Sequence, residues 1–347
     1  MISFTIALLA LIAGYFLYGK FIEHVFKPDN RPTPAIAMAD GVDYIVMPTW
    51  KVFMIQFLNI AGTGPIFGAI MGAWYGPSAY LWIVFGCIFA GAVHDYLSGM
   101  LSVRHGGANL PELVGIYLGK TTKAVMLVFS VILLMMVGVV FVLSPALILG
   151  DICWSTITWV VVIFNYYVLA TMLPIDKIIG KIYPIFAFAL LFMALALMVC
   201  LFYKQPSLPE IWTDLGSAND PDGLLGTASY FKRNPLFPCL FLTIACGAIS
   251  GFHATQSPLM ARCLKSEKAG RAVFFGSMIT EGIVALIWAT VSMYFFYYGG
   301  WRDVANSIDA NTVNNFMAQV HNDGGKSLTQ FFTAPKVVEY VCVGWLG

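Results

Sequence analysis

The sequence has few charged residues and no pattern typical of a metal or redox centre. Asp, Glu, Lys and Arg make up 11% of its 347 residues, whereas an ordinary soluble domain has about 25%. The seven cysteines stand singly, with no CxxC pair, and no HExxH sequence is present, so no zinc site is indicated. The formal net charge of +1 gives no reason to expect a nucleic-acid partner. We expect no cofactor and no bound metal.

Apolar runs of membrane-spanning length are what the sequence has in excess. Hydrophobic residues make up 59% of the chain, and about 20 of them in one helix cross the apolar core of a bilayer. Eight runs reach that length, at 2–26, 51–75, 78–101, 122–149, 152–173, 181–203, 236–258 and 272–298. A ninth begins near Lys336 and is still apolar at Gly347, so we expect a chain truncated within a span. The pattern predicts an all-α, polytopic transmembrane bundle in a single domain, 1–347.

The basic residues predict how these spans are oriented. Lys and Arg gather in short connections on one side of the predicted membrane, whereas the other side has two long loops, 204–235 and 299–335, that also carry many acidic residues. Because basic connections stay in the cytoplasm, the amino terminus is predicted to lie outside. The basic side comprises Lys27, Arg31, Lys51, Arg104, Lys120, Lys123, Lys177, Lys181, Arg262, Lys265, Lys268 and Arg271.

The second predicted span contains Gly-Thr-Gly-Pro inside its apolar run. Glycine favours irregular backbone, and proline removes a donor and disfavours helix in the preceding residue. We therefore expect local unwinding from Gly62 to Pro65. Such a break is tolerated within the membrane only where it faces protein or a wet cavity. Candidate substrate-binding residues here are Gln56, Asn59, Gly62, Thr63 and Gly64.

The seventh predicted span has a matching break, which we expect from Ser250 to Pro258. Four unbroken spans separate the breaks, so each broken helix opens a five-helix unit, at 51–203 and from 236 to the end, and the odd number inverts the second unit. Inverted repeats with broken helices indicate a substrate site at the midplane; the alternative is simple kinking for packing. Candidate substrate-binding residues in this span are Ser250, Gly251, His253, Thr255 and Gln256.

Four ionisable residues inside apolar runs are candidates for proton coupling, because such residues are costly in a membrane and mark ion or proton pathways. They are His94, Asp95, His253 and Glu281. The alternatives are an interfacial His94–Asp95 pair near Arg104 and a structural hydrogen bond for Glu281. The imidazole of His253 titrates near physiological pH, which suits either a proton carrier or a substrate ligand.

Glycines at four-residue intervals form a separate feature. Gly64, Gly68, Gly72 and Gly76 make a repeated GxxxG stripe, which close helix packing explains in full. We assign this stripe no chemistry.

Several motifs together resemble one transporter family. They are Gln56-Phe-Leu-Asn-Ile-Ala-Gly-Thr-Gly-Pro-Ile-Phe-Gly-Ala-Ile70, Gly91-Ala-Val-His-Asp-Tyr96, Ser250-Gly-Phe-His-Ala-Thr-Gln-Ser-Pro258, Met260-Ala-Arg-Cys263 and Glu281-Gly-Ile-Val-Ala-Leu-Ile-Trp288. The sequence is similar to the carbon starvation protein (CstA) family along its whole length. The resemblance implies a bacterial or archaeal inner-membrane carrier with a LeuT-type inverted repeat, here with an incomplete second repeat. It also implies uptake of peptides, or of pyruvate with protons, in the carbon starvation response.

The resulting hypothesis is a proton-coupled symporter, not an enzyme, for a small carboxylate such as pyruvate or for short peptides. Its partners are this substrate, protons and the lipid bilayer; the sequence leaves its oligomeric state open. A non-transporting nutrient sensor on the same scaffold is one alternative. An intramembrane metalloenzyme using His94, Asp95 and His253 is another.

Overall fold

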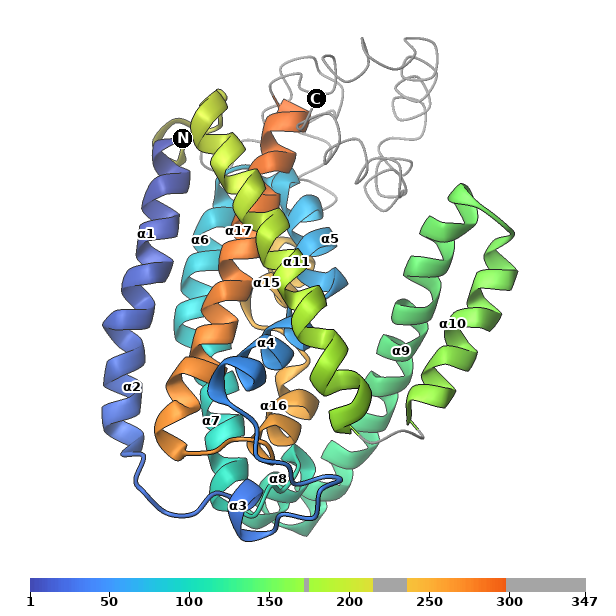
Figure 1. Cartoon of the computed structure of the whole chain (residues 1–347). Helices are drawn as coiled ribbons and strands as arrows, with labels where there is room; N and C mark the ends of the chain where they lie inside the picture. The colour runs from blue at the N-terminus through green and yellow to red at the C-terminus, as the bar shows by residue number, and fades with distance from the viewer. Residues whose placement is uncertain (172–174, 215–235, 298–347) are drawn as a thin grey trace.

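The computed structural model describes residues 1–171, 175–214 and 236–297, which form a bundle of helices running between two ends of the molecule (Figure 1). Within these residues the backbone forms no strand, and one isolated bridge joins Met47 to Leu264. The predicted all-α bundle is therefore confirmed. Loop 215–235, loop 299–335 and the apolar run from Lys336 lie outside the described residues.

The first three predicted spans match helical segments closely, although each is divided into two or three segments. The segments are α1 (Ile2–Phe16) and α2 (Tyr18–Phe26), then the short α3 (Pro34–Ala37), then α4 (Thr49–Ile60), α5 (Thr63–Gly72) and η1 (Ala73–Tyr75), then α6 (Ser78–Phe85), the π-helical η2 (Gly86–Gly91) and α7 (Ala92–Arg104). The π-helical turn was not expected from the sequence.

The later helices also follow the predicted order. They are α8 (Leu110–Leu118), α9 (Lys120–Ile152), α10 (Thr156–Thr171), α11 (Ile175–Lys204), α12 (Ile211–Asp214), α14 (Leu236–Thr243), α15 (Ala245–Ala248), α16 (His253–Ala261), η3 (Glu267–Ala269), η4 (Arg271–Phe275) and α17 (Gly276–Tyr297). The connecting helix α8, begun by a capping box between Asn109 and Glu112, was not predicted.

Six of the eight predicted spans pass a test of length and hydropathy in the part of the chain that the structure describes. Five are single spans, and a sixth is the bent pair of α4 and α5. Helix α10 is apolar but has only 16 residues, and the seventh run is divided among α14, α15 and α16. The chain is thus a multi-pass membrane protein with two interrupted spans.

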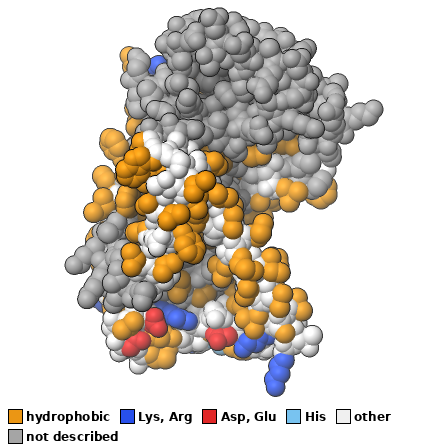
Figure 2. Space-filling view, turned by 90° about the vertical axis from the view of Figure 1, so that its right-hand side faces the viewer, with side chains coloured by type: hydrophobic (Ala, Val, Ile, Leu, Met, Phe, Trp, Pro, Cys, Tyr) orange, Lys and Arg blue, Asp and Glu red, His pale blue; other side chains and the backbone are white. Residues whose placement is uncertain are grey.

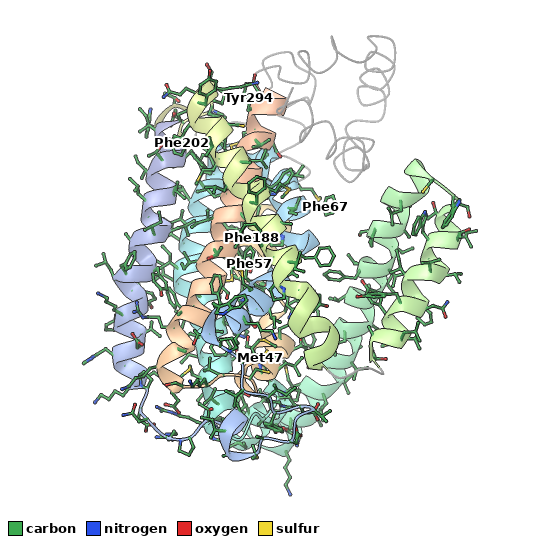
Figure 3. All side chains as sticks on the ribbon, viewed as in Figure 1. Met47, Phe57, Phe67, Phe188, Phe202 and Tyr294 are labelled. Atoms are coloured by element: carbon green, nitrogen blue, oxygen red, sulfur yellow. The ribbon has the colours of Figure 1, made fainter. Side chains whose placement is uncertain are left out.

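Helix α17 lies at the centre of the bundle, whereas the α9–α10 pair lies at its side (Figure 1). Nearly all of α17 is buried, while the most apolar stretch of α9 contains no buried residue. Helix α11 packs along α4, and Phe57 and Phe188 lie at similar height on these two helices (Figure 3). The exposed apolar surface of α9 suits contact with lipid rather than water.

The glycine stripe has the packing role that the sequence predicts at two of its four positions. A Cβ on Gly68 would lie 2.6 Å from the carbonyl oxygen of Thr243, and one on Gly72 would lie 2.2 Å from the side chain of Ile244. The absence of side chains therefore lets α5 approach the second broken span. The expectation of one smooth stripe was wrong at Gly76, which has φ +56° and ends the helical turn η1.

Charged residues gather at the end of the bundle that holds the short basic connections, as Figure 2 shows on one face. Buried Glu267 accepts hydrogen bonds there from Arg104 Nη2 at 3.3 Å and from the backbone N–H of Asp29 at 3.0 Å, and it pairs with Arg31 at 3.5 Å. Arg104 also lies 3.9 Å above the ring of Phe26. One carboxylate thus joins three connections far apart in sequence.

Candidate functional site

The first break lies at Ala61 and Gly62, between α4 and α5. The two half-helices meet at an angle of 49°. Their backbone leaves the helical region at Ala61 (ψ +39°) and Gly62 (ψ −142°). The predicted unwinding from Gly62 to Pro65 was therefore too long and one residue late. Pro65 lies in the first turn of α5, where proline has no hydrogen bond to lose.

The second break lies between α15 and α16, over residues 249–252. Ser250 has φ +51°, a left-handed conformation that is uncommon for a residue with a side chain. The predicted break reached Pro258, but α16 begins at His253 and Pro258 lies inside it. The expected break therefore began one residue late and ended too far along the chain.

The two broken spans run in opposite directions, since α4 lies below α5 and α16 lies below α15 in Figure 1. An aromatic residue of α9 connects the two breaks. The Phe141 ring centroid lies 5.5 Å from that of Phe252, and a Cβ on Gly62 would lie 3.1 Å from Phe141 Cζ. Neither Phe141 nor Phe252 was singled out from the sequence, because phenylalanine is common throughout the apolar runs.

A fully buried polar cluster lies next to the second break, centred on Asp95 of α7. Gln56 of α4 donates from Nε2 to both carboxylate oxygens of Asp95, at 2.9 and 3.1 Å. Ser257 of α16 donates to Asp95 Oδ1 at 2.5 Å and accepts from Gln56 Nε2 at 3.2 Å. All three residues have no exposed surface. Hydrogen bonds to a charged acceptor are roughly twice as strong as neutral ones, so the cluster suits an ionised carboxylate.

Two histidines extend this cluster towards the surface. His253 is fully buried, with Nε2 lying 3.8 Å from Asp95 Oδ2 and having no hydrogen-bond partner. Its Nδ1 lies 3.2 Å from Nδ1 of His94, which is exposed. In such a contact one nitrogen carries the hydrogen and the other accepts it. The pair can therefore exchange a hydrogen but cannot hold one on both facing nitrogens.

Glu281 is buried in α17 with neither carboxyl oxygen hydrogen-bonded. It lies within electrostatic range of Asp95. The structural hydrogen bond considered for Glu281 is therefore absent from the described residues. The interfacial alternative for Asp95 is also wrong, because Asp95 has no exposed surface and Arg104 pairs with Glu267.

The remaining predicted residues lie around the breaks without joining the Asp95 cluster. Asn59, Gly62 and Gly64 are half-buried around the first break, and Thr63 begins α5, although its side chain lies outside the described part. Around the second break, Ser250 is buried, Gly251 is exposed, and Thr255 and Gln256 are half-buried.

Ser257 is the functional candidate that sequence reasoning missed. It lies four residues after His253, so the two share one face of α16. The four-residue spacing could therefore have indicated from the sequence that Ser257 lies beside His253.

The described residues contain no group of three or more His, Cys, Asp or Glu placed to hold a metal ion. His94, Asp95 and His253, which the metalloenzyme alternative required, are hydrogen-bonded or packed against one another instead. Nothing in this part of the chain therefore favours that alternative.

Comparison with known proteins identifies relatives. The family model described as carbon starvation protein CstA matches residues 1–158 and 142–333. An uncharacterized membrane protein of Haemophilus influenzae is 46% identical over 341 residues, covering 85% of this chain and 91% of that protein.

Several relatives carry the name peptide transporter CstA. The Campylobacter jejuni protein is 29% identical over 91% of this chain and 53% of its own length, and the Escherichia coli protein is 27% identical over 92% and 54%. The chain thus spans about half the length of these two transporters. No solved structure matches the chain.

Proposed function

Because the chain belongs to the carbon starvation protein CstA family, we propose that it is a secondary active transporter that imports a small carboxylate such as pyruvate, or short peptides, together with protons. The proposed setting is the inner membrane of a bacterium or archaeon, with the amino terminus outside. The names of the peptide transporters among its relatives support the transport role.

The proposed architecture is a LeuT-type inverted repeat, with 51–203 as the first unit and 236–347 as the beginning of the second. Its support is the opposite direction of the two broken spans (Figure 1) and their contacts with the same residue of α9. Inverted repeats of this kind carry substrate near the middle of the membrane. Residues 1–26 form an additional span before the repeat.

The single observation that carries the proposal is that both breaks converge beside a buried polar cluster. Helices α5 and α16 both begin at a break, and both breaks lie beside Phe141 of α9, so their amino termini, with free N–H groups, lie in the same region. Such ends attract anions, which suits the carboxylate of pyruvate or of a peptide. Gly251 and His94 are the exposed parts of this region.

Proton coupling is proposed for His94, His253, Asp95 and Glu281. The side chains of the first three form a path from an exposed imidazole through a buried one to a buried carboxylate. A histidine can accept a hydrogen at one ring nitrogen and release it from the other. Nδ1 of His253 lies 3.2 Å from His94 Nδ1, and Nε2 lies 3.8 Å from Asp95 Oδ2, so transfer to Asp95 requires the last two atoms to come closer.

Uptake into proteoliposomes tests transport and coupling together. The 347-residue chain is reconstituted, and uptake of labelled pyruvate and of a labelled dipeptide is measured with and without an inward proton gradient. We expect the gradient to drive accumulation of one of them. We expect His253→Asn to reduce this accumulation to the level without a gradient, and His105→Asn to leave it unchanged, because the His105 side chain contacts Leu101 and Tyr117 away from the cluster.

Two results would count against the proposal in different ways. Flux equal with and without the gradient contradicts proton coupling while leaving transport intact. Absence of uptake for both classes of solute contradicts transport by this chain and favours the non-transporting sensor.

A further inference from the structure

One carboxylate connects three spans in the interior of the bundle. Asp95 belongs to α7, and its hydrogen-bond donors come from α4, through Gln56, and from α16, through Ser257. Gln56 and Ser257 also bond to each other. The contact between His253 and His94 is a further link between α16 and α7.

The strength of this connection depends on the charge of Asp95. An ionised carboxylate has only acceptor positions, and it accepts from both the amide of Gln56 and the hydroxyl of Ser257. A protonated carboxyl is a weaker acceptor, and its hydrogen bonds with Gln56 and Ser257 are those between neutral groups. The bond from Ser257 that holds α16 to Asp95 is therefore strong in one charge state and weaker in the other.

The groups facing Asp95 make a change of charge possible. His94 and His253 lie beside it on α7 and α16, and Glu281 of α17 is within electrostatic range. Among the described residues, the ion-pair partner of Asp95 is His253 rather than a Lys or Arg. His94 is the exposed titratable group of this set, so the two imidazoles offer a proton a route from the surface to Asp95.

Helix α16 is short and follows a non-helical segment. It has only nine residues, and it is separated from α15 by the non-helical residues 249–252. Gly251 in this segment is exposed, and a Cβ there would meet nothing within 4 Å. Ser257 lies in the middle of α16, so its bond to Asp95 acts on the helix as a whole.

We propose that Gln56 and Ser257 are positioning residues that bind α16 to α4 and α7 through ionised Asp95, and that a proton on Asp95 releases α16. Protonation of Asp95 would thus move α16, which borders the proposed substrate region. The role of this movement in uptake rests on the proposed function. Gln56 was expected to bind substrate. In this mechanism Gln56 instead donates hydrogen bonds whose strength depends on the charge of Asp95.

Hydrogen–deuterium exchange of α16 tests the release without any substrate. The full chain in detergent is compared with Asp95→Asn, Ser257→Ala and Thr255→Ala over a range of pH. Each variant is compared with the unmodified chain at the same pH, which cancels the intrinsic effect of pH on exchange. Thr255 is the matched control, because its hydroxyl donates to Phe252 near its own helix.

The amide introduced by Asp95→Asn mimics the uncharged carboxyl. We therefore expect α16 in this variant to exchange about tenfold or more faster than in the unmodified chain at high pH, the factor expected for loss of a bond to a charged group. The difference should vanish at low pH. Ser257→Ala should behave in the same way, because α16 has then lost its hydrogen bond to Asp95 at every pH, whereas the unmodified chain loses it only when Asp95 is protonated. Thr255→Ala should follow the unmodified chain.

The proposal would be overturned if the exchange rate of α16 in Asp95→Asn, divided by that in the unmodified chain, were the same at every pH. Such a result would show that the contact is structural and does not respond to the charge of Asp95. Equal exchange in Asp95→Asn and the unmodified chain throughout would overturn it too. Should Asp95→Asn fail to fold, the comparison of Ser257→Ala with the unmodified chain across the pH range alone decides. Because no substrate is present, these outcomes are independent of whether the chain transports pyruvate, peptides or neither.

Discussion

Asp95 and Glu281 are two buried carboxyl groups with opposite surroundings. Asp95 accepts hydrogen bonds from Gln56 and Ser257, whereas neither oxygen of Glu281 has a partner among the described residues. An ionised carboxylate without a donor or a cation is very costly to bury. Glu281 therefore fits its site only as a neutral group, which makes it a cost to stability that an apolar side chain would not incur.

Replacement of Glu281 by methionine, which has similar length, should stabilise the folded chain by about 1–3 kcal/mol, because a buried polar group without a partner is removed. The matched change Gln56→Met should destabilise it by a similar amount, because Asp95 loses a donor. Unfolding by SDS in mixed micelles measures both. Destabilisation by Glu281→Met equal to that of Gln56→Met would show that Glu281 has a hydrogen-bond partner after all.

The sequence indicated several residues of the candidate site, but it did not indicate their hydrogen-bond partners. Asp95, His253 and Glu281 could be named because an ionisable group inside an apolar run is rare for energetic reasons. The partnership of Gln56 with Asp95 could not, because it depends on the relative rotation of α4, α7 and α16. A hydroxyl such as Ser257 carries no comparable signal, since serine is tolerated anywhere along a membrane helix.

At the scale of elements, glycine and proline occupy different positions relative to the breaks. Glycine at 62 marks the first break itself, whereas Pro65 and Pro258 lie inside the helices that follow. Sequence reasoning joined these residues into longer breaks, because proline disfavours helix in its neighbourhood. The positive φ of Ser250 was not predicted, since a residue with a side chain seldom adopts it.

Substitution of Gly68 tests whether this glycine is needed for the close approach of α5 to the second broken span or only for backbone flexibility. Gly68→Ala should destabilise the chain by about 1–2 kcal/mol, because its Cβ would lie 2.6 Å from the backbone of Thr243 and overpacking costs more than helix propensity returns. Gly138→Ala in α9 is the control, since nothing lies within 4 Å of that position. It should raise stability by up to about 1 kcal/mol, as measured by the same SDS unfolding. Equal effects at both positions would contradict close packing at Gly68.

At the scale of the whole molecule, Glu267 ties the end of the first span to the third span and to the connection before α17. Its carboxylate is buried and has Arg104 and Arg31 as partners. Loss of one member of a buried ion pair leaves the other charge without compensation. This cluster therefore holds together the end of the bundle where the short basic connections meet (Figure 2).

Substitution of Glu267 by glutamine should destabilise the chain by about 2 kcal/mol, less than for a fully buried pair because Arg104 is partly exposed. Asp29→Asn is the control, because the Asp29 side chain is 47% exposed and solvent screens its pairing with Arg31, so we expect a small effect. The side-chain hydrogen bond from Arg31 lowers the pKa of Asp29 to about 2, so its contribution is present above about pH 4 and is lost only as the pH falls further. Thermal unfolding at pH 7 compares the two variants; equal losses would contradict the role of Glu267.

Helix α9 has a consequence for how the protein sits in its membrane. Its 33 residues extend about 50 Å, well beyond the thickness of the hydrocarbon layer, about 30 Å, and Figure 1 shows it leaning away from the bundle. A helix with such mismatch adjusts its tilt when the acyl chains become longer or shorter. Because Phe141 of α9 touches Phe252 at the second break, we expect lipid chain length to alter the geometry of that break.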